Sequence, residues 1–260
     1  MTQFSVLLKK EFLESWRSFK FLWIPLVFIL LGVTEPLTNY YMEDILAAVG
    51  NMPEGFQMLF PELTAADILL STTGQYQLIG LLVLISAFIG SISRERHNGT
   101  ATLLYVRPIS ATTVFASKWI IASLVSIISA VLGYVASMYY TAILFGSVAV
   151  SDFVKMLLTY CVWLLLVMAI TIAMSAAFQT GAAAAIAIVL LPVGLLIDSA
   201  IGSFWPWTPW KLANHGLSFV TETVVMKDFG MALLFTAIAI ISFIGIGILA
   251  TKRNWRLTKV

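Results

Sequence analysis

Hydrophobic residues along this chain fall into six long runs that are separated by shorter polar segments. The runs are Phe21–Leu37, Tyr76–Ile92, Trp119–Phe145, Phe153–Phe178, Ala182–Ile201 and Gly230–Ala250. A helix needs roughly 20 apolar residues to cross the hydrocarbon core of a bilayer, and tilt or ragged ends absorb the differences in length. The pattern therefore predicts an all-α integral membrane protein with six transmembrane helices.

The composition favours a chain that is solvated by lipid. Hydrophobic residues make up 60% of the 260 residues and charged residues only 11%, whereas soluble domains carry about 25% charged residues. A soluble helical protein could not place six such runs at its centre. We expect one transmembrane domain over residues 1–260, without a separate soluble catalytic domain. The single cysteine, Cys161, excludes an intrachain disulfide and a multi-cysteine metal site.

Basic residues predict the orientation, because they concentrate on the cytoplasmic side of a membrane. Twelve of the 15 stand before the first run, between the second and third runs, and after the last. They are Lys9, Lys10, Arg17, Lys20, Arg94, Arg96, Arg107, Lys118, Lys252, Arg253, Arg256 and Lys259. Six spans with both termini in the cytoplasm satisfy the rule, whereas five or seven would place a basic cluster outside. The first run lacks a small-x-small cleavage site, so we interpret it as a retained helix.

The segment 39–73 is expected on the outer side and is acidic. It carries five carboxylates and no lysine or arginine: Glu43, Asp44, Glu54, Glu62 and Asp67. Such a segment either attracts cations and cationic peptides or is simply a solvated surface, and the latter is the commoner case.

Residues 1–20 form an amphipathic pattern ahead of the first run. The apolar arc of the helical wheel holds Phe4, Leu8, Phe12, Trp16 and Phe19. The opposite arc holds Lys10, Glu14 and Arg17, and Lys10 and Glu14 have the spacing of an i,i+4 ion pair. This pattern is typical of a helix that lies in the inner headgroup plane. We expect this helix to be an elbow helix that braces the first span and contacts a partner, or a simple anchor on the membrane surface. The two roles are compatible.

The segment 93–113 predicts a short amphipathic helix between two turns. Asn98 and Gly99 favour a turn, and Thr100 can cap the helix that follows. Pro108 ends that helix, and Ser110 can cap the helix that enters the third run. Such an element either transmits a push from a soluble partner to two spans or is an ordinary connector.

The same loop shows an acid, a Gly-Thr pair, leucines, a proline, a hydroxyl residue and a lysine before a span. These residues are Glu95, Gly99, Thr100, Leu103, Leu104, Pro108, Ser110 and Lys118. This order resembles the permeases of type-2 ABC exporters. The chain departs from them in having one acid, Glu95, between Arg94 and Arg96, where the family has an acid-rich start. The amphipathic amino-terminal helix, the six spans and the interrupted fifth span extend the resemblance over nearly the whole chain.

The resemblance implies a transport subunit without a nucleotide site of its own. Two such permeases pair as a homodimer or heterodimer, and two ABC ATPase subunits dock beneath them. The elbow helix, with Lys10, Glu14, Trp16 and Arg17, and the loop helix would contact the ATPases. ATP and Mg²⁺ are then expected in the ATPase, and this chain would bind no cofactor or metal. The sequence agrees, since it lacks a G-x-x-x-x-G-K-[ST] phosphate loop. Membrane lipid is an expected partner and nucleic acid is not.

The fifth run and the segment 193–215 suggest irregular backbone near the outer face. Pro192 interrupts the run, Asp198 follows, and a Pro/Trp-rich stretch contains Trp205, Trp207 and Trp210. Irregular backbone at membrane depth has to be shielded by protein or to face a wet cavity. The permeases that the chain resembles have short re-entrant helices here that close the outer mouth, so the resemblance implies that these residues form an outer gate. The tryptophans also fit an interfacial aromatic belt, and Asp198 also fits a structural cap.

Two other classes of function remain open. A membrane-embedded enzyme needs convergent His, Asp, Glu or Ser side chains at one depth, and the runs hold few such groups. An immunity or sensor protein would bind a peptide or amphiphile without moving it. The overall architecture and the lack of disulfides favour a bacterial inner membrane as the location.

Overall fold

The protein is described by a computed structural model over residues 3–49, 63–99, 109–221 and 223–257. Its described part is helical. The first half contains α1 (Gln3–Arg17), α2 (Lys20–Tyr40), α3 (Met42–Val49), α4 (Ala65–Gln75), η1 (Tyr76–Gly80), α5 (Leu81–Phe88), α6 (Ser93–His97) and α8 (Ala111–Leu144). The second half contains α9 (Val150–Ala177), α10 (Thr180–Ile188), η2 (Val189–Val193), α11 (Gly194–Ile201), η3 (Gly202–Phe204), η4 (Pro209–Lys211), α12 (Leu212–Leu217) and α13 (Met226–Leu257).

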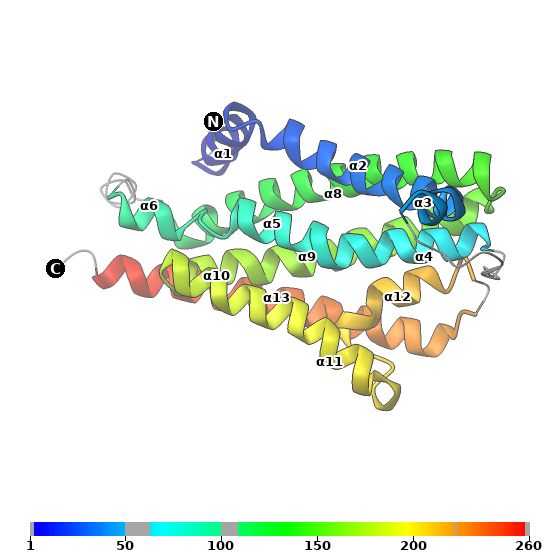
Figure 1. The fold of residues 1–260 in the computed structure, drawn as a ribbon. Coiled ribbons are helices and arrows are strands. Elements are labelled where there is room, and N and C mark those ends of the chain that lie inside the picture. The colour runs from blue at the N-terminus through cyan, green and yellow to red at the C-terminus, as the bar shows by residue number, and fades with distance from the viewer. Residues whose placement is uncertain (1–2, 50–62, 100–108, 222, 258–260) are drawn as a thin grey trace.

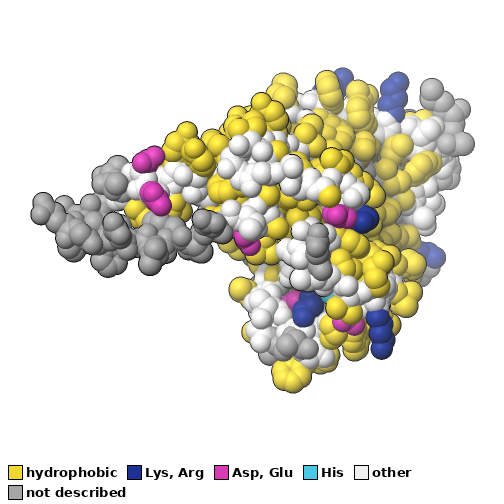
Figure 2. Space-filling model, turned by 90° about the vertical axis from the view of Figure 1, so that its right-hand side faces the viewer, with side chains coloured by type: hydrophobic (Ala, Val, Ile, Leu, Met, Phe, Trp, Pro, Cys, Tyr) yellow, Lys and Arg dark blue, Asp and Glu magenta, His cyan; other side chains and the backbone are white. Residues whose placement is uncertain are grey.

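Six segments of the described chain are long and apolar enough to span a bilayer, as the hydrophobic runs predict. They are Lys20–Tyr40, Ala65–His97, Ala111–Leu144, Val150–Ala177, Thr180–Ala200 and Met226–Asn254. The bundle brings both termini and α6 to one end, and α3 and α12 lie toward the other (Figure 1). Viewed onto that second end, hydrophobic side chains are exposed between acidic, basic and other polar ones (Figure 2).

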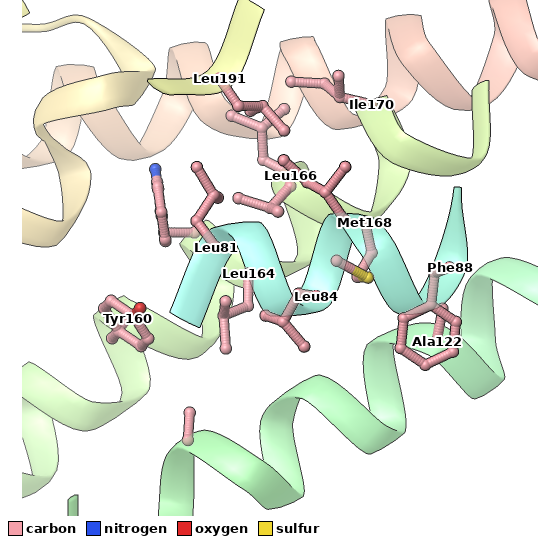
Figure 3. Close-up of a cluster of buried hydrophobic side chains, with 14 of the residues drawn as sticks. Leu81, Leu84, Phe88, Ala122, Tyr160, Leu164, Leu166, Met168, Ile170 and Leu191 are labelled. Atoms are coloured by element: carbon pink, nitrogen blue, oxygen red, sulfur yellow. The ribbon is translucent and has the colours of Figure 1, made fainter. Parts of the chain in front are cut away.

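The fourth span, α9, is the centre of the bundle. It is the most buried of the six spans, and α5, α8, α10, α12 and α13 all pack against it. Figure 3 shows Leu84 and Phe88 of α5 beside Met168 of α9 and Ala122 of α8. The fifth and sixth spans are the least buried, so most of their surface is left for lipid or another protein.

The second span begins eleven residues before the predicted run, at Ala65. Thr64 and Asp67 form a capping box at this start, with the Asp67 carboxylate 2.9 Å from the Thr64 backbone nitrogen. The first turns were excluded from the hydrophobic run because they are polar. Thr72 and Thr73 are nevertheless buried, since their hydroxyl groups contact Ser137 at 3.0 Å and Tyr134 at 2.8 Å on α8. The expected outer segment 39–73 therefore includes the last residues of α2 and the first turns of this span.

The first and third spans touch at two glycines. A Cβ added at Gly32 would lie 2.4 Å from the Gly133 carbonyl oxygen, and one added at Gly133 would lie 2.8 Å from the Phe28 carbonyl oxygen. Tyr76 of the second span fills the remaining space and donates a hydrogen bond of 2.9 Å to the Phe28 oxygen. This contact locks the first three spans together by close backbone approach.

The fifth span passes Pro192 without ending there. The α-helix changes to the π-helical turn η2 at Val189–Val193 and resumes as α11. A π-helical turn accommodates the missing N–H of proline, so the helix adjusts at this point instead of stopping. Beyond Gly202 the chain makes two 3₁₀ turns, and α12 packs its buried face on α9.

Candidate functional site

Four charged side chains form a closed ring at the end of the bundle that holds both termini. The Glu11 Oε1 atom lies 3.0 Å from the Lys10 ammonium and 2.9 Å from that of Lys118. The Glu95 Oε1 atom lies 2.5 Å from Lys10 and 3.0 Å from Lys118. The ring therefore joins α1, α6 and α8, which are far apart in the sequence.

The ring is partly shielded from solvent, so its members depend on one another. The Lys118 side chain is only 2% exposed and that of Glu11 10% exposed. Burial lowers the pKa of Lys10, but attraction to Glu11 and Glu95 and hydrogen bonds to both outweigh it, so the net pKa lies above its usual range. Removing one charge would leave each of its two neighbours with a single ring partner in a poorly solvated site.

The buried residues of helix α1 follow one another at i,i+4 spacing, so they form a single face that is turned toward the ring. Leu7, Glu11 and Ser15 are its buried residues, and α1 packs mainly against α8. Phe19, with φ of +56°, makes the turn from α1 into α2. A left-handed conformation is unusual for a bulky residue, and here it sets the angle at which the helix meets the first span. The helical wheel did not predict a role for Glu11, because this residue belongs neither to the apolar arc nor to the opposite, charged arc.

The predicted residues of the amino-terminal helix have separate environments. Lys10 and Glu14 form the expected i,i+4 ion pair at 3.3 Å. Trp16 is 60% exposed, and its ring stacks near Phe12 and lies 6.1 Å from Phe21. Arg17 is exposed in the last turn of α1. The aromatic face thus points away from the protein, where an interfacial helix would contact lipid.

Arg96 binds the opposite side of the bundle from Glu95. Its guanidinium donates to the carbonyl oxygens of Ala176 at 2.9 Å, Ser175 at 3.3 Å and Phe178. These carbonyls lie at the carboxyl end of α9, where a cation also interacts favourably with the helix dipole. Asn254 of α13 donates to the same Ala176 oxygen at 2.8 Å. The second, fourth and sixth spans therefore meet here, at the end of the bundle that holds the charged ring.

Ser175 strengthens the contact between α6 and α9. Its hydroxyl oxygen accepts hydrogen bonds from the backbone nitrogens of Ile92 at 3.0 Å and Ser93 at 3.1 Å. The Ser93 hydroxyl lies 2.8 Å from that of Thr180, the first residue of α10. The amino end of α6 is therefore fixed to both the fourth and the fifth span.

The predicted loop residues are only partly within the described chain. Glu95 belongs to the ring. Asn98 and Gly99 form the expected turn, with Gly99 at φ of +71°, a conformation that favours glycine. Ser110 caps α8 by accepting a bond of 3.1 Å from the Thr113 backbone nitrogen. Thr100, Leu103, Leu104 and Pro108, with the short helix expected there, lie outside the described residues.

The predicted outer residues gather at the far end of the fifth span. The Asp198 carboxylate accepts a hydrogen bond of 2.5 Å from Thr208, and Trp210 lies against Gly194. A mainly apolar cavity of about 260 Å³ lies between α11 and this segment, and Trp205 and Trp210 are among its lining residues. Trp207 is outside this cavity and packs on Phe235 of α13 at 5.0 Å between ring centroids. Pro192 lies earlier in the fifth span, in η2, and does not line this cavity.

Three carboxylates beside the charged ring are close enough to one another to bind a metal ion, if spacing alone is considered. The oxygens of Glu11, Glu14 and Glu95 lie within 4.8 Å of one another. Each of them already contacts the ammonium of Lys10, and two also contact Lys118. The arrangement is thus a lysine–glutamate network.

Comparison with known proteins identifies the family. Residues 5–208 match the model of the ABC-2 family transporter protein, which covers most of the chain, so this protein belongs to that family. It is also similar to the uncharacterized transmembrane protein YxlG of Bacillus subtilis (strain 168). The two share 32% identity over 254 residues, 97% of this chain and 96% of the relative. The protein is a multi-pass membrane component of a transport family.

Proposed function

We propose that this chain is the permease subunit of an ATP-driven ABC exporter. It would form the translocation path with a second copy or a second permease and couple to two separate ATPase subunits. The observation that carries the proposal is the position of α6. This short helix bonds through Glu95 to α1 and α8, and through Arg96 and Ser93 to α9 and α10.

The bonds of α6 suit it to distribute a force. A partner that pushes on α1 and on the loop after Gly99 would act on the charged ring first. The ring passes that displacement to the third span through Lys118. Arg96 passes it to the fourth span through the carbonyl groups of Ala176 and Ser175. Residues 93–113 would thus serve as the coupling segment, with Gly99, Thr100, Leu103, Leu104, Pro108 and Ser110 as its remaining members.

The charge distribution supports an orientation with α1, α6 and both termini in the cytoplasm. These elements share one end of the bundle, and most of the basic residues belong to them or to their flanks (Figure 1). The opposite end, with α3 and the Trp-rich segment, would face the outside. Asp198, Trp205, Trp207, Trp210 and Pro192 would then form the outer gate of a bacterial inner-membrane exporter.

Copurification tests the proposal. The chain is tagged in its native host and extracted in mild detergent, and copurifying ATPases are quantified. We expect an ABC ATPase in roughly equal amount, and its loss or uncoupling in Glu95→Ala and Gly99→Pro. Glu43→Ala, an exposed carboxylate at the other end, is the matched control and should keep the ATPase. The absence of any ATPase under mild conditions would refute the proposal.

A further inference from the structure

A polar cavity of about 380 Å³ lies beside the charged ring, between α1, the start of α2, the end of the second span and α8. Its lining includes Lys20, Phe88, Ser91, Arg94 and Asn98 together with the ring. Cations exceed carboxylates by one among its lining residues. The cavity thus combines an excess positive charge with apolar and hydroxyl-bearing walls.

Two of its cations are not neutralised by the ring. Lys10 and Lys118 contact Glu11 and Glu95, and Lys10 also contacts Glu14. In the part of the chain that the structure describes, no carboxylate lies within 4.0 Å of the Lys20 ammonium or of the Arg94 guanidinium. The Lys20 nitrogen instead lies 4.6 Å from the centre of the Phe88 ring. A half-buried ammonium that makes no close ion pair favours an anion in the adjacent space.

The surroundings of the cavity are those of a membrane interface. Phe12, Trp16 and Phe21 form an aromatic cluster that joins α1 to α2, with ring centroids 5.1 to 6.2 Å apart. Phe19 and Leu22, on either side of Lys20, are both 66% exposed. Aromatic and leucine side chains exposed in this way sit at the boundary between headgroups and acyl chains. An anion that enters here therefore arrives next to a surface that lipid chains cover.

We propose that this cavity binds the headgroup of an anionic phospholipid from the adjoining leaflet. Lys20 and Arg94 contact the phosphate, and Ser91 and Asn98 are placed to bond the polar part of the headgroup. The acyl chains extend along the exposed face of α2 that begins at Leu22. Basic pockets between transmembrane helices are suited to such headgroups. The site is independent of the proposed coupling to an ATPase, since it needs only this chain and the lipid.

Native mass spectrometry of the purified, delipidated full-length chain tests this site. Phosphatidylglycerol and phosphatidylcholine are titrated in detergent, and inorganic phosphate is titrated in parallel by thermal shift. We expect phosphatidylglycerol to bind at least about tenfold more tightly than phosphatidylcholine. Lys20→Gln combined with Arg94→Gln should reduce that preference by about tenfold or more, because each basic residue contributes to the attraction. Lys20→Arg with Arg94→Lys should retain it.

The control removes the same charge from the same end of the bundle. Lys252→Gln with Arg253→Gln alters two exposed residues of α13 that do not line the cavity and should leave the preference intact. Unchanged lipid preference in the Lys20/Arg94 double variant, or an equal loss in the control, would overturn the proposal. It would also be overturned if inorganic phosphate alone stabilised the chain and phosphatidylglycerol gave no further effect. Unfolding midpoints of all variants establish that they are folded.

Discussion

Glu95 and Arg96 are consecutive residues, and their side chains bind opposite sides of the bundle. The Glu95 carboxylate lies 3.0 Å from the Lys118 ammonium on α8, and the Arg96 guanidinium lies 2.9 Å from the Ala176 oxygen on α9. A helix of five residues therefore connects the third and fourth spans at their charged ends. Each side of this connection can be broken separately.

Lys118→Met should destabilise the protein strongly. The change leaves the Glu11 carboxylate in a poorly solvated site with the partly exposed Lys10 as its remaining ring partner. Breaking a buried ion pair costs about 3–5 kcal/mol, and this network should lose a similar amount of unfolding free energy. Unfolding in detergent measures the effect. Lys9→Met, an exposed residue of α1, is the control, and a similarly small effect at both positions would contradict the prediction.

The second change, Arg96→Ala, should loosen the contact between α6 and α9. Three carbonyl oxygens lose a charged donor, and such hydrogen bonds each contribute about 1.5–3 kcal/mol when shielded. We expect faster hydrogen exchange at residues 93–97 and 174–178. Arg96→Lys should have an intermediate effect, because an ammonium cannot reproduce the planar arrangement of donors that a guanidinium offers to several carbonyl groups. Arg17→Ala removes an exposed guanidinium from α1 and should leave both segments protected. Equal exchange in Arg96→Ala and the wild type would show that the contact is unimportant.

Replacing Gly133 with alanine should force the first and third spans apart. The added Cβ would lie 2.4 Å from the Tyr76 hydroxyl and 2.8 Å from the Phe28 carbonyl oxygen. A side chain can move away from such a contact by changing its rotamer, but a backbone carbonyl group cannot. Overpacking of this kind costs about 1–3 kcal/mol. Gly245→Ala, in α13, is matched because its Cβ would meet nothing within 4 Å and should be neutral or stabilising. Equal unfolding midpoints for the two variants would disprove the close contact.

At the other end, Asp198→Ala should release α11 from the segment that follows it. The Thr208 hydroxyl loses its acceptor at 2.5 Å, and we expect a loss of about 1–3 kcal/mol. In Asp198→Asn the amide oxygen can still accept this bond, so the effect on stability should be smaller. Transport distinguishes the roles of this residue: an intact rate in Asp198→Asn would argue against a charge-dependent gate.

The contribution of Lys10 to the stability of the folded protein should not change with pH below the ordinary pKa of lysine. Because its pKa is raised in the folded protein, the stabilisation is complete below the unfolded pKa and is lost only as pH rises through the folded value. The difference in unfolding midpoint between the wild type and Lys10→Met should therefore stay constant from about pH 7 to 10, since the ordinary pKa of lysine is near 10.5. A decline already at pH 8 would contradict the raised pKa.

Hydropathy alone predicted the six spans, and local signals predicted several of their ends. The capping role of Ser110 and the Lys10–Glu14 pair depend on residues three and four positions apart, which a sequence displays directly. The early start of the second span was missed, although Thr64 and Asp67 have the spacing of a capping box. The first part of this span contains polar residues, so a hydropathy pattern does not include it. Thr72 and Thr73 are buried there because their hydroxyl groups form hydrogen bonds with residues of α8, which the sequence does not reveal.

The charged ring could be predicted only in part. Glu95 was singled out from the loop pattern, and Lys118 from its place before a span. Their connection through Glu11 joins three distant segments, and no local pattern encodes such a distance. Arg96 was interpreted only as part of a basic flank, because its partners are backbone carbonyl groups, which every residue has.

The contact between Gly32, Gly133 and Tyr76 also bears on how the protein is made. All of its atoms come from the first 144 residues, and the three spans that carry them precede α9 in the chain. These helices can therefore pack together while the remaining spans are still being synthesised. The ring residues Lys10, Glu11, Glu95 and Lys118 belong to the same portion, so the first half can assemble as a unit to which α9 is added afterwards.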